Sequence, residues 1–192
     1  TGEIVIVGTA SQENELTVDP TALQDQDGLG EFNYQWLRDG SEISGATSTA
    51  YTLAEADVGN KISVRVTYTD GYGASEIVTS SETSAVTNRN DDPTGAVTIT
   101  GTAVEDETLT VDSTLADADG LGALSYQWKA DGADISNATG STLTLSQDEV
   151  GKEITVTVSY TDGGGTTEGV TSAASSLVTN VDDARTGDVI TS

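Results

Sequence analysis

The residues in this sequence that could do chemistry are mainly carboxylates, because the chain contains neither histidine nor cysteine. Two aspartates stand two residues apart in "DADG", Asp117 and Asp119, and a near copy, "DQDG", places Asp25 and Asp27 in the same way. Oxygen ligands of this kind suit hard divalent cations. Without histidine or cysteine, a Ser-His-Asp or Cys-His catalytic arrangement and the usual zinc sites are excluded within the chain.

The net charge of the chain excludes some classes of binding partner. The 192 residues include 32 acidic and 7 basic side chains, for a net charge of −25. Such a surface repels nucleic acid and anionic membranes, so we expect neither as a partner. No apolar run approaches the roughly 18–20 residues that a membrane-spanning helix needs, so we expect no membrane insertion. The same charge could serve only to keep the protein soluble, and this alternative stays open for any single carboxylate.

The sequence contains two copies of one domain. With a shift of 92 positions, residues 25–88 fall on residues 117–180, and 34 of the 64 positions are identical. The repeats begin "TGEIVI" and "TGAVTI", and the chain closes with "TGDVITS". We therefore expect domains at residues 1–92 and 93–185, and the start of a truncated third repeat at residues 186–192. The chain is then a piece of a longer array, and its function is that of a repeated unit.

Apolar and polar residues alternate with a period of two, which is typical of half-buried strands. The segment "KISVRVTY" and its copy "EITVTVSY" show this most clearly, with the apolar positions Ile62, Val64, Val66, Tyr68, Ile154, Val156, Val158 and Tyr160. About seven such segments, separated by Gly, Asp and Asn, fill each repeat of roughly 92 residues. The sequence predicts an all-β fold of two tandem seven-stranded Greek-key sandwiches arranged end to end. We expect Trp36 and Trp128 in the cores rather than in a sugar-binding surface.

Two stretches resemble immunoglobulin-like domains. "YQWLRDG" resembles their third strand, whose tryptophan packs between the sheets, and "YTLAEADVGNKISVRVTY" resembles the two strands and the Asp-Gly turn that follow later in the domain. The disulfide of antibody domains is absent, since the chain has no cysteine. This resemblance implies the sandwich fold and identifies no role by itself.

A second resemblance, to cadherin-type repeats, is sharper. "DADGLGALSY" resembles their Asp-x-Asp stretch, and "VTYTDGYG" and "VSYTDGGG" resemble the aspartate after their sixth strand. "NRNDDP" resembles their Asp-x-Asn-Asp-Asn linker, "QENE" their Glu-containing turn, and "LAEAD", more loosely, an acidic pair before the last long strand. These motifs follow the family's order along the chain. The resemblance implies Ca²⁺ bound between consecutive repeats.

The topology of such a sandwich predicts where the acidic residues gather. The chain leaves one end of the first repeat and enters the opposite end of the second, where two loops also lie. We expect three acidic stretches to converge there and to repel one another unless a cation is bound. Ca²⁺ fits better than Mg²⁺, which prefers a stricter octahedron. The predicted ligands are Glu13, Glu55, Asp57, Asn90, Asp91, Asp92, Asp117, Asp119 and Asp162. The Asp-Gly pairs could instead be simple turn formers, and Asp91 and Asp92 solvated linker charge.

The function implied by these patterns is structural. The repeats resemble those of a large bacterial calcium-dependent adhesin, extracellular or at the cell surface, in which they act as spacers and contact neighbouring repeats of the same chain. We expect a monomer that reaches polysaccharide or a cell-surface ligand through other domains. A carbohydrate-binding module of a secreted protein is the alternative, and homophilic adhesion a third. The carbohydrate-binding alternative calls for a row of exposed aromatic residues, and Tyr72 is the one aromatic that the sequence predicts to be exposed. We expect no enzyme, since paired carboxylates could hydrolyse a glycoside but lie where no cleft is implied.

Overall fold

The structure, a computed structural model, describes residues 2–182. The chain folds as two compact units, Thr1–Arg89 and Asn90–Ser192, which we call unit 1 and unit 2. The sequence-based boundary at residues 92 and 93 stays a prediction, and the expected start of a third repeat lies outside the described residues. Among the described residues, no helix has the length and apolar character needed to cross a membrane.

Unit 1 is a sandwich of a three-stranded sheet, ordered β1-β2-β5, and a four-stranded sheet, ordered β4-β3-β6-β7. All strand pairs are antiparallel. The short fourth strand pairs with the third, so it belongs to the larger sheet. The elements are β1 (Val5–Val7), β2 (Glu15–Asp19), β3 (Asn33–Arg38), β4 (Ser41–Glu42), β5 (Ala50–Thr52), the 3₁₀ turn η1 (Glu55–Asp57), β6 (Ile62–Thr69) and β7 (Ser75–Thr79).

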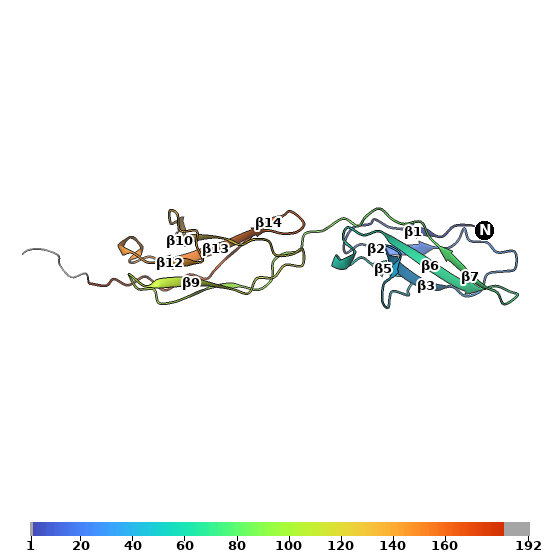
Figure 1. Cartoon of the computed structure of the whole chain (residues 1–192), viewed down its shortest axis with the longest axis horizontal. Coiled ribbons are helices and arrows are strands. Elements are labelled where there is room, and N and C mark those ends of the chain that lie inside the picture. Colours follow the sequence, from blue (N-terminus) through green and yellow to red (C-terminus); the bar gives the residue numbers. More distant parts are fainter. Residues whose placement is uncertain (1, 183–192) are drawn as a thin grey trace, which may run out of the picture. The chain divides into compact units, whose positions relative to one another are not determined.

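Unit 2 repeats this order strand for strand. Its sheets are β12-β9-β8 and β11-β10-β13-β14, again antiparallel throughout, and β9 lies in the layer opposite β10, β13 and β14 (Figure 1). The elements are β8 (Val97–Thr100), β9 (Thr108–Ser113), β10 (Ser125–Ala130), β11 (Ala133–Asp134), β12 (Thr142–Thr144), η2 (Gln147–Glu149), β13 (Ile154–Thr161) and β14 (Thr167–Thr171). The predicted all-β fold of two seven-stranded sandwiches is confirmed by this strand order.

Each unit has its own apolar core around one tryptophan. Trp36 and Trp128 are fully buried, and each indole N–H donates to a backbone carbonyl at 2.9 Å, that of Ser48 or of Gly140. The alternating positions of β6 and β13 that were predicted to face inward are all buried. Burial on this scale is the main force that holds a small sandwich together.

One close backbone approach fixes the loop that carries the Asp-x-Asp pair. A Cβ atom built on Gly122 would lie 2.0 Å from the carbonyl oxygen of Thr161, and one built on Gly30 would lie 2.1 Å from that of Thr69. No side chain fits at such a distance, so only glycine lets this loop lie against β13 or β6. The second glycine of each "GLG" therefore holds the acidic loop against the end of the sixth strand of its unit.

Candidate metal-ligating residues

The loop between β9 and β10 of unit 2 is held in place by the carboxylate of Asp117. One oxygen, Oδ1, accepts a hydrogen bond from the backbone N–H of Asp119 at 2.9 Å, which closes a local turn. The other, Oδ2, accepts one from the phenol of Tyr160 on β13 at 2.6 Å. Burial of Tyr160, together with this bond to a carboxylate, raises the pKa of its phenol, so the group stays a donor. Asp117 thus has a definite structural task, and it orients Asp119.

Asp162, in the loop between β13 and β14, carries the most informative oxygen of unit 2. The residue is 6% exposed, and Oδ1 accepts a hydrogen bond from the backbone N–H of Thr166 at 2.7 Å. Its other oxygen, Oδ2, is buried and has no hydrogen-bond partner among the described residues. The next residue, Gly163, donates to the backbone carbonyl of Asp119 at 2.9 Å, so the two acidic loops lie side by side. A buried carboxylate oxygen without a donor is unfavourable and calls for an explanation such as a bound ion.

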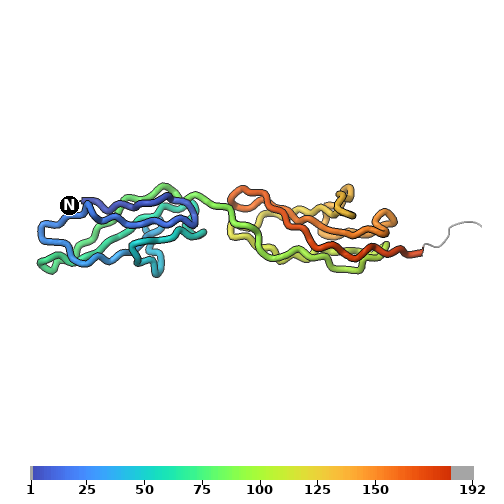
Figure 2. The backbone as a smooth tube through the Cα atoms, turned by 180° about the vertical axis from the view of Figure 1, so that it is seen from behind, coloured from blue at the N-terminus to red at the C-terminus, as the bar shows by residue number. Residues whose placement is uncertain are grey.

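The chain that enters unit 2 is attached to these loops. The backbone N–H of Asp91 donates to Oδ2 of Asp119 at 2.8 Å, and carboxylate oxygens of Asp91 and Asp119 lie within 4.8 Å of each other. The Asn90 side chain donates to Glu168 on β14 at 2.9 Å. Figure 2 shows this segment, in green, at the same end of unit 2 as the orange-red loop after β13, which contains Asp162. The structure therefore brings carboxylate oxygens of Asp91 and Asp119 together, and it places Asp162 in the loop that is bonded to the Asp119 loop.

Asp92 differs from its neighbours. Its side chain is exposed, and no hydrogen bond or ion pair to it exists among the described residues. The prediction that it binds metal stays untested.

Unit 1 has the same two loops and serves as an internal comparison. Asp25 accepts bonds from the N–H of Asp27 at 3.0 Å and from the phenol of Tyr68 at 2.8 Å. The Asp27 N–H bond, followed by the Tyr68 bond, lowers the pKa of Asp25. Asp70, however, is only half-buried, and its Oδ1 accepts bonds from two backbone amides. Thr1 aligns with Thr94, so the positions equivalent to Asn90, Asp91 and Asp92 fall before the first residue of the sequence given.

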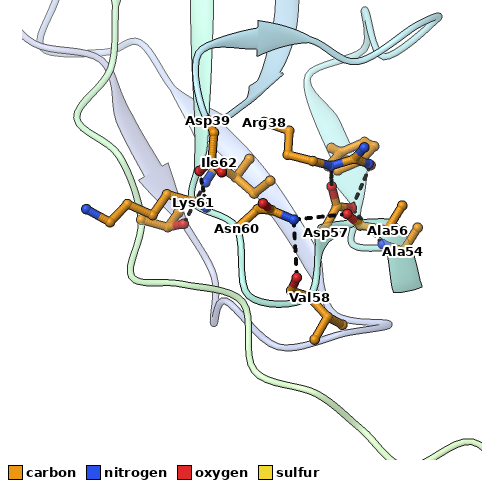
Figure 3. A network of polar contacts seen from close by, with 11 residues as sticks. Arg38, Asp39, Ala54, Ala56, Asp57, Val58, Asn60, Lys61 and Ile62 are labelled. Atoms are coloured by element: carbon orange, nitrogen blue, oxygen red, sulfur yellow. Dashed lines mark hydrogen bonds and ion pairs between the residues drawn. The ribbon is translucent and has the colours of Figure 1, made fainter. Parts of the chain in front are cut away.

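Asp57, another predicted ligand, has protein partners for both carboxylate oxygens, and the prediction that it binds metal stays untested. Asp57 is fully buried, and its Oδ1 accepts from Nε of Arg38 at 2.7 Å (Figure 3). Its Oδ2 accepts from the Tyr51 phenol at 2.7 Å and the Ala54 N–H at 2.8 Å. Both oxygens already have donors, and one donor is a cation. The ion pair between Arg38 and Asp57 is specific to unit 1, because unit 2 has Ala130 in place of Arg38.

The other two predicted ligands of unit 1 lie near its C-terminal end. Glu13 is exposed, adopts a positive φ of 64°, and forms an ion pair with Arg89. The buried side chain of Gln12 accepts from the Arg89 N–H at 3.0 Å, so the chain leaving unit 1 is held by the β1–β2 turn. Glu55 begins η1 and is half-buried. Within unit 1, Arg89 supplies the positive charge that Glu13 was predicted to obtain from a cation.

The sequence analysis missed two kinds of positioning residue. One is the buried tyrosine of the Tyr-x-Asp sequence, Tyr68 and Tyr160, whose phenol bonds the first aspartate of the acidic loop. Its recurrence two residues before Asp70 and Asp162 was a usable signal. The other is Glu105, the counterpart of Gln12, which is 4% exposed and accepts from the Val181 N–H at 3.0 Å. Both units therefore hold their outgoing chain by the same device.

Comparisons with known proteins found similar solved structures but no family. No protein-family model matches the sequence, and no curated protein matches it. Solved structures that are similar to it include fibronectin(III)-like modules of Clostridium thermocellum CbhA, with 16% identity over 96% of this chain and 100% of that one, and a TM-score of 0.31. An amphioxus IgVJ-C2 molecule matches with 13% identity, 93% and 97% coverage and a TM-score of 0.37. Murine CEACAM1b matches with 14% identity, 93% and 100% coverage and a TM-score of 0.33. The fold assignment depends on the strand order described above.

Proposed function

We propose that this chain is a pair of structural spacer repeats from a long extracellular bacterial adhesin, and that Ca²⁺ bound at the end of unit 2 where the chain enters it stiffens the array. The observation that carries the proposal is the buried Oδ2 of Asp162, which lacks a donor among residues 2–182 and lies in the loop beside Asp119. Asp91 and Asp119 add oxygens from the entering chain and the adjoining loop. The role is mechanical and non-catalytic.

The chemistry of these residues favours Ca²⁺. A carboxylate set from three separate segments is adaptable, and Ca²⁺ accepts six to eight oxygens in flexible geometry, including backbone carbonyls and water. Asp91, Asp119 and Asp162 are the direct ligands in this proposal, and Asp117 positions the loop. Asn90 and Asp92 stay predictions, as do Glu13 and Glu55, and the proposal does not depend on them. We expect a dissociation constant on the order of 10⁻⁴–10⁻³ M, as in extracellular modules.

Binding of Ca²⁺ would order the connection because Asp91 belongs to the chain that leads out of unit 1. A cation that holds Asp91 against the two loops removes conformational freedom from that chain. The ordered form is favoured by an amount that grows with the logarithm of the Ca²⁺ concentration above the dissociation constant. A string of such repeats would then be stiffer in calcium-rich surroundings and more flexible without the ion.

Calorimetric titration of the EDTA-treated chain tests the proposal. We expect Ca²⁺ to bind, Mg²⁺ to bind at least about tenfold more weakly, and Asp162→Asn to remove binding. The matched control is Asp70→Asn, which changes the equivalent residue of unit 1 and should leave the titration unchanged. Absence of binding by the unsubstituted chain would refute the proposal. Equal affinity in the Asp162→Asn variant would refute the assignment of this site.

The carbohydrate-binding alternative has one observation in its favour. Tyr72, at the tip of the loop between β6 and β7, is 86% exposed, as predicted, and its ring is available for stacking on a sugar. In unit 2 the equivalent residue is Gly164. Retention of the chain by insoluble polysaccharide, abolished by Tyr72→Ala and independent of Ca²⁺, would support this second function.

A further inference from the structure

Both prolines of this chain follow an aspartate, at Asp19–Pro20 and at Asp92–Pro93. Such bonds are chemically unusual. The proline nitrogen belongs to a tertiary amide without an N–H, and once protonated it leaves readily as a secondary amine. The aspartate carboxylate can reach its own main-chain carbonyl carbon through a five-membered ring. Acid therefore cleaves Asp–Pro bonds faster than other peptide bonds, provided that the carboxylate is free to attack.

The Asp19–Pro20 bond lies in a closed local structure. One carboxylate oxygen of Asp19 accepts hydrogen bonds from the N–H of Thr21 at 3.0 Å and from its hydroxyl at 2.7 Å. These bonds lower the pKa of Asp19 and hold its oxygen toward residue 21. Asp19 is also the last residue of β2, paired with Val5, and the Pro20 carbonyl accepts from the N–H of Leu23 at 3.0 Å. Attack on the main chain would require these contacts to open.

The Asp92–Pro93 bond lies in open chain between two attached points. On one side the backbone N–H of Asp91 donates to Oδ2 of Asp119 at 2.8 Å, and on the other the Thr94 N–H donates to the carbonyl of Ala116 at 2.8 Å. The Asp92 carboxylate is exposed and has no partner among the described residues, so it can rotate freely.

The charged groups of unit 2 along this segment are all carboxylates. They are Asp91 itself, Asp119 against Asp91, Glu168 against Asn90, and Asp162 in the adjoining loop. None of these groups is a hydrogen-bond or ion-pair partner of the Asp92 carboxylate.

We propose that Asp92–Pro93 is an acid-triggered cleavage site that separates the two folded units. An Oδ atom of Asp92 adds to the Asp92 carbonyl carbon, the bond to the nitrogen of Pro93 breaks, and that nitrogen leaves with a proton from the solvent. The product is a cyclic anhydride at Asp92. Water then opens the anhydride and restores the side-chain carboxyl group together with a C-terminal carboxyl group. One water molecule is consumed in total, and no oxidant, metal or second protein takes part.

The position of this bond gives the cleavage a defined product. The cut falls between the cores, because every strand of unit 1 ends before Asp92 and every strand of unit 2 begins after Pro93. Acid would thus release whole folded modules and would leave the Asp19–Pro20 turn of unit 1 intact. The inference is independent of Ca²⁺, and its test is carried out in EDTA.

The test follows fragments of the full chain by mass spectrometry at the lowest pH at which near-ultraviolet circular dichroism stays native. We expect fragments 1–92 and 93–192 to form at least about tenfold faster than fragments 1–19 and 20–192, since the second cut needs local opening. In concentrated guanidinium chloride the two rates should converge. Asp92→Glu, which keeps the charge but needs a six-membered ring, should slow the cut at residue 92 by about tenfold.

Asp19→Glu is the matched control and should leave the cut at residue 92 unchanged. Equal rates at the two bonds in the folded chain would overturn the inference. So would an unchanged rate in Asp92→Glu, or no cleavage of the folded chain within the time that half of the unfolded chain is cut at residue 92.

Discussion

Asp162→Asn should change the stability of unit 2 in opposite directions with and without Ca²⁺. In EDTA, the Asp162 side chain keeps one buried oxygen for which the described part of the chain supplies no donor, and the residue is 6% exposed. Leaving a buried polar group unsatisfied costs roughly 1–3 kcal/mol. Asparagine has nearly the same shape and keeps an oxygen for the Thr166 N–H, with its NH₂ group in place of Oδ2. The NH₂ group is also polar, but it is uncharged, and because an unpaired buried charge costs more than an unpaired neutral group, we expect the free energy of unfolding to rise by about 1 kcal/mol.

With Ca²⁺ the order of stability should reverse. The unsubstituted chain gains RT ln(1 + [Ca²⁺]/Kd), which is about 1.4 kcal/mol at ten times the dissociation constant and about 2.7 kcal/mol at a hundred times. The variant should gain almost nothing. At a hundredfold excess, unsubstituted unit 2 should therefore be the more stable by about 2 kcal/mol. Two curves of stability against Ca²⁺ concentration that cross at moderate concentration are the distinctive result.

Hydrogen exchange read by mass spectrometry is the suitable assay, because peptides from β6 and β13 report on the two units separately. Asp70→Asn is the control, since Asp70 is half-buried and already accepts two amide bonds. It should weaken unit 1 slightly and independently of Ca²⁺. The reasoning is refuted if Asp162→Asn destabilises unit 2 in EDTA, or if the variant keeps the Ca²⁺-dependent gain.

Three further predictions concern the rest of the fold. Arg38→Met should destabilise unit 1 by about 2 kcal/mol, because it leaves the buried Asp57 carboxylate without its cation. The expected loss is not larger, because the Arg38 side chain is one-third exposed and solvent screens its charge. Unfolding in denaturant measures the loss, and a value below about 0.5 kcal/mol would contradict the prediction. Burial and the bond to Asp57 raise the pKa of Tyr51 to about 12, whereas a tyrosine of the unfolded chain has a pKa of about 10. The stability that this bond contributes is therefore present below about pH 10 and should be lost as the pH rises through about 12. Tyr51→Phe should remove this part of the loss of stability in alkali, and an unchanged profile of stability against pH in the variant would contradict the prediction. Gly122→Ala should destabilise unit 2 in thermal melts, because the new Cβ atom would lie 2.0 Å from a backbone carbonyl oxygen. Gly169→Ala, whose Cβ atom would have no neighbour closer than 3.9 Å, should be nearly neutral. Similar effects of the two substitutions would show that the loop moves to accommodate the added methyl group and would contradict the prediction.

The fold could be predicted because its determinants are local and occur twice. Alternation with period two identified the inward positions of β6 and β13, and the two copies of "YQW" identified both core tryptophans. The burial of Trp36 and the exposure of Tyr72 follow from the same periodicity, which placed one on a strand and the other in a turn.

The partners of individual carboxylates could not be predicted in the same way, because they depend on contacts far apart in sequence. Asp57 pairs with Arg38, 19 residues away, and Asp117 with Tyr160, 43 residues away. Counting acids near a linker does not separate a carboxylate that already has donors from one that lacks them. A comparison of the two copies does indicate that Arg38 and Asp57 are partners, because both are replaced in unit 2, by Ala130 and Glu149.

Small-angle scattering of the full chain, in EDTA and in saturating Ca²⁺, tests the central claim most directly. The account predicts that Ca²⁺ narrows the distribution of distances between the two units of one molecule and lengthens the mean of these distances. Asp162→Asn should abolish this change, and Asp70→Asn should preserve it. Identical scattering with and without Ca²⁺, in a chain whose calorimetry shows that the ion is bound, would contradict the claim that calcium stiffens the repeats.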